Sequence, residues 1–232
     1  MGTLTLSQIR DDLKIALENR TDILDSQLNR WINEGYEFIC QPEVRKHREL
    51  EANYDITLAT DTNSYSISKS TVGYDILGIR DVTFYDATTI TNTTTRHDVR
   101  PRSIQWFNKR TLYATSGGPR HFYVGGDEIN FSPVTTSTDN GKKVRLSVWR
   151  SPTLLSADSD LTVLNTYFDT AVILAATWVG QFRLGYRELA IATRQELQTY
   201  MNQKTDTGQL GGEDTNFEAQ IENELYLEIS PS

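Results

Sequence analysis

The acidic pair Asp158 and Asp160 is the arrangement in this sequence that is best suited to metal chemistry. Two carboxylates at that spacing can hold a magnesium ion together with substrate phosphates. The pair stands between a predicted strand that ends at Pro152 and a predicted helix, where aspartate and serine commonly form turns and caps. Because isolated short motifs have a high false-positive rate, we favour the turn interpretation and predict no metal site.

The other reactive residue types are few. The three histidines, His47, His97 and His121, show no metal-ligand spacing such as two histidines one helical turn apart. Cys40 has no histidine close to it in sequence, and we interpret it as a small core residue and not as a nucleophile. With one cysteine no intramolecular disulfide can form, which is typical of a reducing compartment. We therefore predict that the protein is not an enzyme and binds no cofactor.

Two further motifs have residue types that occur in ligand-binding sites. Gly117-Gly118-Pro119 precedes a predicted strand and does not open a helix, so we interpret it as a turn and not as a phosphate-binding loop. Trp106-Phe107 is the one candidate for an aromatic platform that binds sugar. Packing against the core explains the tryptophans on predicted helix faces more simply than sugar binding does. We favour packing for Trp106-Phe107 too.

Length and composition indicate a globular protein. The chain has 232 residues, of which 38% are hydrophobic and 23% charged, enough for one large domain or two small ones. No apolar run approaches the ~20 residues that span a bilayer, so we predict no membrane segment. The net charge is −8, but residues 205–232 hold seven acids and no Lys or Arg, which leaves 24 acids and 23 bases before them. The near-neutral body lacks the basic footprint of a DNA-gripping protein.

Hydrophobic residues at helical spacing predict two short amphipathic helices at the start of the chain. The first covers about residues 7–20 with Ser7 as its N-cap, because a serine hydroxyl can accept a free backbone N–H of the first turn. The second has Asp25 as its N-cap and ends near Cys40, because Pro42 disfavours continuation of the helix. The short connection between them favours an antiparallel pair.

The helical period returns late in the chain. A third helix is predicted from Asn165 or Thr166 to a break at Gly185, and a fourth over residues 186–202. The residues expected to face inward from the fourth helix are Leu189, Ala190, Thr193, Leu197 and Tyr200.

Between the two pairs of helices the hydrophobic period changes to two, which is typical of strands with one buried face. The alternating segments are residues 54–58, 65–67, 82–84, 121–124, 129–131 and 144–149. Residues 125–127 predict a hairpin and residues 139–141 another turn. The threonine-rich residues 88–95 are interpreted as an extended excursion from the sheet, with a hairpin tip or mobile loop as alternatives.

The acidic tail, residues 205–232, contains more apolar residues than a solubilising end needs. It includes a glycine-rich joint at residues 208–212, so we predict a tethered segment that orders only against a partner. The residues expected to bind that partner are Phe217, Ile221, Leu225, Tyr226, Leu227 and Ile229.

Taken together, these segments resemble the head-to-tail adaptor (connector) proteins of tailed bacteriophages. The matching segments are residues 6–10 (LSQIR), 28–36 (LNRWINEGY), 118–133 (GPRHFYVGGDEINFSP) and 144–152 (VRLSVWRSP), followed by Leu155, Asp158 to Asp160 and an alanine-rich helix begun by Tyr167. They occur in the family's order and cover most of the first 200 residues. The threonine-rich insert and the acidic tail lie outside the pattern.

This resemblance and the periodicity together predict an α+β fold. Residues 1–50 and 160–204 are expected to form a helical bundle, with an inserted, mainly antiparallel β lobe over residues 51–159. Residues 205–232 are expected to extend as a C-terminal tail. The resemblance carries no catalytic residues.

The resemblance also implies a function, that of a structural virion protein made in the host bacterial cytoplasm. Copies are expected to form a ring, usually of twelve, between the portal and the tail (nozzle) proteins at the head-to-tail junction. DNA would pass through the lumen without sequence-specific binding, and the tail residues from Phe217 to Ile229 would reach the portal. A near-neutral body agrees with such a channel, because phosphate contacts supply most non-specific DNA affinity.

The sequence leaves two other classes of function open. One is a carbohydrate- or receptor-binding tail module, in which Trp106 would contact the sugar. The other is a metal-dependent hydrolase that uses Asp158 and Asp160. Neither explains why helices stand at both ends of the sequence.

Overall fold

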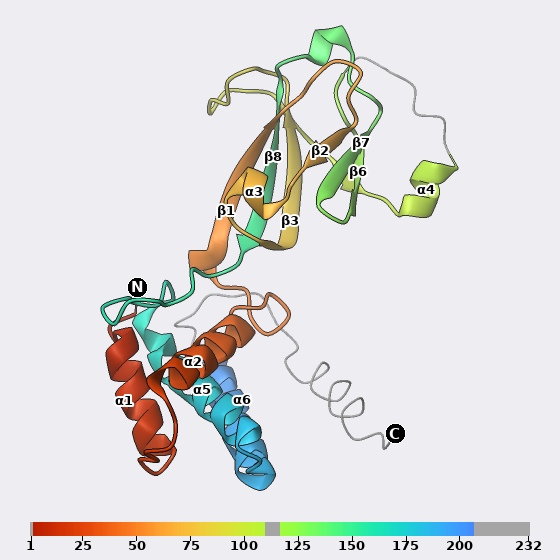
Figure 1. Cartoon of the computed structure of the whole chain (residues 1–232). Helices are drawn as coiled ribbons and strands as arrows, with labels where there is room; N and C mark the ends of the chain where they lie inside the picture. The colour runs from red at the N-terminus through yellow and green to blue at the C-terminus, as the bar shows by residue number, and fades with distance from the viewer. Residues whose placement is uncertain (1, 110–116, 207–232) are drawn as a thin grey trace. The chain divides into compact units, whose positions relative to one another are not determined.

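The computed structural model describes residues 2–109 and 117–206 of the chain, which form a mixed α+β structure (Figure 1). Contacts divide the chain into two compact units. One, called the helical unit below, comprises the described residues up to Leu50 and those from Ser151 to Asp206. The other, called the β unit, comprises Glu51–Arg150.

The helical unit is built around α5, which packs against each of the three other long helices of the unit. These helices are α1 (Leu6–Ala16), α2 (Asp25–Ile39), α5 (Asp169–Arg183) and α6 (Arg187–Asp206), with short 3₁₀ turns η1 (Arg48–Leu50) and η3 (Thr166–Phe168). Their apolar faces form one core, in which Ile32, Tyr36 and Ala175 are fully buried. The amphipathic patterns of residues 7–40 and 165–202 therefore meet in one core.

Small residues let α2 and α5 approach closely. A Cβ atom built on Gly35 of α2 would lie 2.6 Å from the backbone nitrogen of Ala176 in α5. Ala171, Ala175 and Ala176 are all fully buried on the facing side of α5. The alanine-rich pattern of this helix is thus explained by the short distance between the two backbones.

Both predicted N-caps of the early helices are wrong. Thr5, not Ser7, caps α1: Thr5 Oγ1 accepts the N–H of Gln8 at 3.3 Å, and Gln8 Oε1 accepts the N–H of Thr5 at 2.9 Å. This reciprocal capping box satisfies two backbone donors, whereas a serine cap alone satisfies one. Asp25 is the first residue of α2, one position after its N-cap, and its carboxylate pairs with Lys14 Nζ at 2.8 Å.

The end of α1 and the inward face of α6 also differ from prediction. α1 ends at Ala16 and not near residue 20, because Glu18 adopts a left-handed backbone with φ of 61°. In α6, Ala190 and Leu197 are buried as predicted, but Leu189 is 54% exposed. Successive residues of a helix are turned by about 100°, so Leu189 lies off the buried face that Ala190 occupies.

The β unit contains two four-stranded sheets, with orders β1-β8-β3-β4 and β2-β7-β6-β5 (Figure 1). The strands are β1 (Glu51–Thr57), β2 (Ser64–Ser66), β3 (Ile76–Tyr85), β4 (Arg96–Asp98), β5 (Arg100–Pro101), β6 (His121–Gly125), β7 (Glu128–Ser132) and β8 (Lys143–Arg150); the short helices are α3 (Lys69–Val72), α4 (Ile104–Asn108) and the 3₁₀ turn η2 (Ser137–Asp139). All the pairs are antiparallel except β5 with β6. Val144, Leu146 and Val148 of β8 alternate inward, as predicted.

The predicted turns of the β unit are present. β6 and β7 form the hairpin expected at residues 125–127, and a turn at residues 139–141 precedes β8. The threonine-rich residues 88–95 lie within the connection between the antiparallel strands β3 and β4, so they form a hairpin tip. The favoured interpretation, an extended excursion, is wrong, because the threonine side chains bond to one another in a turn, as Thr91 Oγ1 and Thr94 Oγ1 do at 2.9 Å.

Candidate interaction surfaces

The carboxylates of the acidic pair that suggested metal binding accept hydrogen bonds from other groups of the protein. Asp158 Oδ1 accepts a hydrogen bond from Arg10 Nη2 at 2.9 Å. Asp160 Oδ2 accepts the backbone N–H groups of Ser156 at 2.7 Å and Ala157 at 2.8 Å, and these bonds lower the pKa of the carboxyl. The turn interpretation of these residues agrees with both sets of contacts.

Cys40 and His47 are buried in the helical unit. Cys40 is a free thiol in the core, as predicted, and burial raises its pKa. His47 is 2% exposed, and its Nε2 donates to the carbonyl oxygen of Ile39 at 2.8 Å. Burial lowers the pKa of His47 to about 4, so the ring is neutral at physiological pH. Across residues 2–109 and 117–206, the structure groups no three His, Cys, Asp or Glu side chains that could hold a metal ion.

The glycine motif at residues 117–119 forms a turn, and Trp106 packs against neighbouring side chains. Gly117 and Gly118 both have positive φ, 103° and 72°, and they form the turn that leads into β6. The Trp106 ring is half-buried, with its centroid 4.8 Å from that of His121 and the Arg102 guanidinium 5.7 Å above it. These contacts agree with the turn and the packing interpretations.

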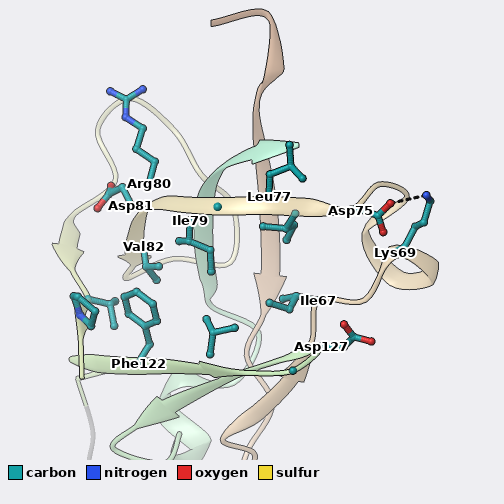
Figure 2. Close-up of a pocket in the computed structure, with 16 residues that line it drawn as sticks. Ile67, Lys69, Asp75, Leu77, Ile79, Arg80, Asp81, Val82, Phe122 and Asp127 are labelled. Atoms are coloured by element: carbon teal, nitrogen blue, oxygen red, sulfur yellow. Dashed lines mark hydrogen bonds and ion pairs between the residues drawn. The ribbon is translucent and has the colours of Figure 1, made fainter. Parts of the chain in front are cut away.

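A groove of about 540 Å³ lies in the β unit between β3 and β6 (Figure 2). It exists because each of these strands is paired along only part of its outer edge. β4 pairs with β3 from Thr83 to Tyr85, and β5 pairs with β6 only at His121 and Phe122. The chain of β4 and β5 therefore closes one part of the gap between the two sheets, and no described strand closes the rest.

The walls of this groove are mainly apolar. Ile79 and Val82 of β3 point into it and face Phe122 of β6, whereas Arg80 points away (Figure 2). An ion pair between Lys69 and Asp75, 2.6 Å long, stands at one end. Apolar walls between partly unpaired strand edges suit an extended polypeptide that adds a strand to the sheet. The sequence does not reveal this groove, because the extent of strand pairing depends on contacts between residues far apart in the sequence.

A second surface lies at one end of the helical unit, where the α1–α2 and α5–α6 connections meet (Figure 1). Arg20 Nη1 of the first connection donates to Tyr186 Oη of the second at 2.6 Å. Four large apolar side chains around these connections, which we call the apolar end, are between 43% and 67% exposed: Leu24, Phe182, Tyr186 and Leu189. Clusters of exposed apolar side chains mark protein interaction sites.

The six tail residues predicted to bind a partner lie outside the described residues, as does everything after Asp206. Within the described part of the chain, no helix is long and apolar enough to cross a membrane.

Both surfaces are of the kind by which structural proteins contact other proteins. Comparison with family models identifies the family: the model described as SU10 adaptor protein matches residues 4–216, and the chain belongs to this family of phage adaptor proteins. The resemblance inferred from sequence is thereby confirmed, and the protein is a structural protein of the phage virion. None of the curated proteins that were compared with the chain matches it.

Proposed function

We propose that the protein joins the portal to the tail (nozzle) proteins at the head-to-tail junction of the virion. Copies form a closed ring, usually of twelve, whose lumen passes the DNA. Membership of the adaptor family supports this role for residues 4–216. The structural observation that supports the ring is the apolar end, where Leu24 is 67% exposed and Leu189 is 54% exposed.

The apolar end is assigned to the contact between neighbouring copies. A ring requires two different surfaces of the same chain to meet, because the interface repeats head to tail until it closes. Burying large apolar side chains contributes roughly 1.5–3 kcal/mol each, which suits a contact that must hold under the load of a packaged genome. The proposed scaffold of the ring is the helical unit, and the β unit, Glu51–Arg150, is proposed to contact the tail.

The near-neutral body and the acidic tail have separate proposed roles. The 24 acids and 23 bases of residues 1–204 give the body almost no net charge, so DNA can slide past it without strong phosphate contacts. Residues 205–232 dock on the portal through the apolar residues between Phe217 and Ile229. Deleting residues 208–232 should therefore weaken binding to purified portal, and an unchanged affinity would refute this part.

The copy-to-copy contact is tested with Leu189→Asp, which places a charge on the apolar end without touching the core. Gln195→Asp, also exposed on α6, is the matched control. Light-scattering masses are measured for each variant mixed with portal. We expect full occupancy of the portal by the wild type and by the control, and at least a tenfold weaker assembly by Leu189→Asp. Equal assembly by all three chains would rule out the apolar end as the contact.

A further inference from the structure

Residues 99–126 of the β unit hold basic side chains and no acidic ones. They contain five Lys or Arg and no Asp or Glu, although the whole chain has 31 acids and 23 bases. The near-zero net charge of residues 1–204 therefore conceals one basic stretch. An excess of one sign of charge creates a local field that attracts a partner of the opposite sign.

The fold gathers arginines of this region on neighbouring segments. β4 and β5 follow one another with only Val99 between them, and Val99 is buried. Because side chains of an extended chain alternate between its two faces, Arg96, Arg100 and Arg102 lie on the face opposite Val99. Arg100 N donates to the carbonyl oxygen of Arg120 at 3.0 Å, which brings the residue before β6 beside β5. All four arginines are exposed, and we call them the arginine cluster.

The arginine cluster has no acidic partner in the part of the chain that the structure describes, and Asp98, the one acid between Arg96 and Arg120, pairs with none of its members. Four other bases of the β unit do form ion pairs: Lys69 with Asp75, Arg80 with Glu51, Lys142 with Asp86, and Arg145 with Asp55. A base that is paired with a carboxylate adds little to the field outside the protein. The arginine cluster, in contrast, keeps its full charge.

The chemistry around the arginine cluster fits phosphate groups. The guanidinium of Arg102 lies 5.7 Å from the centre of the Trp106 ring, and a guanidinium stacked on an aromatic ring still presents its N–H edge for a bidentate bond to phosphate. Gln105, Asn108 and Lys109 of α4 are exposed and add further donors. These are residue types that contact the sugar and phosphate groups of nucleic acids.

The spacing of the arginines also suits a regular polyanion. Residues two positions apart on a strand are separated by about 6.6 Å, which applies to Arg100 and Arg102. Duplex DNA carries one negative charge per ~1.7 Å of its axis, so side chains at this separation reach different phosphates whatever the base sequence. Such contacts give affinity that depends on salt and not on sequence.

We propose that the arginine cluster binds the backbone phosphates of duplex DNA. The inference rests on the proposed function in one respect, that DNA passes through the ring. Each copy contributes one arginine cluster, so contacts that are weak singly act together along one DNA molecule. The competing partner is the acidic tail of another copy, residues 205–232. DNA is favoured because the tail also carries apolar residues, whereas Gln105, Asn108 and Lys109 beside the cluster are polar.

Fluorescence anisotropy of a labelled DNA duplex mixed with the full chain tests this site. The variant combines Arg100→Gln with Arg102→Gln, and the control combines Lys69→Gln with Arg80→Gln, which removes the same charge from paired positions. At ~50 mM salt we expect the variant to bind about tenfold more weakly than the wild type, and its salt slope to be less steep by roughly 1.8, about 0.9 for each lost phosphate contact. The control should bind like the wild type.

Arg100→Gln alone serves if the double variant does not fold, and it should reduce the salt slope by about half as much. Equal binding by the variant and the wild type would overturn the proposal, and so would an equal loss in the control. A peptide of residues 205–232 that displaces DNA and loses its own binding in the variant would assign the arginine cluster to the tail instead. Assembly of the same chains on portal is measured in parallel, and a wild type that fails to assemble there would refute the ring and not this site.

Discussion

The side-chain amide of Asn33 in α2 bonds to both backbone groups of Leu155. Asn33 Nδ2 donates to the Leu155 carbonyl oxygen at 2.9 Å, and Asn33 Oδ1 accepts the Leu155 N–H at 2.9 Å. Tyr36 lies three residues further along α2, and its Oη accepts the N–H of Val163 at 2.9 Å. One face of α2 thus holds the irregular chain that precedes α5, because it supplies partners that this chain cannot provide for itself.

Replacing Asn33 by aspartate tests this pairing. A carboxylate has no N–H to give, so the Leu155 carbonyl loses its donor while the size of the side chain is retained. We expect the free energy of unfolding to fall by about 1–3 kcal/mol, measured by urea titration. Asn92→Asp, on the exposed hairpin tip, is the control and should change it by less than about 0.5 kcal/mol. Equal effects of the two changes would show that the Asn33 bonds contribute little.

Gly35→Ala is expected to separate α2 from α5. Its Cβ atom would meet backbone atoms of Ala175 and Ala176, which cannot move without shifting the helix. Overpacking of this kind costs about 1–3 kcal/mol, which thermal unfolding will report as a lower midpoint.

Gly180→Ala is the matched comparison for Gly35→Ala, because both glycines lie within long helices. At Gly180 the added atom would meet side chains only, Trp31 at 3.1 Å and Leu17 at 3.2 Å, which can adjust. The better helix propensity of alanine, about 1 kcal/mol, offsets that contact. A stability loss at Gly180 as large as that at Gly35 would contradict the close approach of the two backbones.

His47 makes stability depend on pH between about 4 and 6.5. Its folded-state pKa is about 4, because burial disfavours the charged ring, whereas an unfolded histidine has a pKa of about 6.5. In that window the unfolded chain binds a proton that the folded chain does not, so stability falls as the pH falls, by up to about 1.4 kcal/mol per pH unit. Above pH 6.5 both states are neutral at this position, and the contribution is fully present.

The variant His47→Gln isolates this effect from the titration of carboxylates. Unfolding free energies are measured from pH 4 to 7 for the wild type, for His47→Gln and for His97→Gln, whose ring lies on β4. The slope of the wild type and of His97→Gln should exceed that of His47→Gln. Identical slopes for all three chains would show that His47 is not protonated on unfolding in this range.

The groove between β3 and β6 is expected to bind an extended segment of a tail protein. Val124 lines the groove but is 44% exposed, so Val124→Arg should leave the unfolding midpoint almost unchanged while it blocks strand addition. We expect it to weaken binding of the tail (nozzle) protein at least tenfold in a pull-down with the assembled ring. Thr89→Arg, exposed on the hairpin tip, is the control for added charge. Normal tail binding by Val124→Arg would exclude the groove.

Local patterns predicted the elements better than the contacts between them. The alternation of Val144, Leu146 and Val148 and the alanine-rich face of α5 follow from burial on one side, which periodicity reports directly. The role of Asn33 was not predictable, because its partner lies 122 residues away in the sequence. Leu189 lies off the buried face of α6, because helical spacing alone does not show which of two adjacent apolar residues is buried.

Electron microscopy of the protein mixed with its purified portal tests the ring most directly. We expect annular particles in which copies of this chain surround an open channel below the portal. The apolar ends, marked by Leu24 and Leu189, should be buried between neighbouring copies. Leu189→Asp should abolish these annuli, and Gln195→Asp should not. Portal particles that carry single, separate copies would contradict the proposed ring, and so would copies whose apolar ends face solvent.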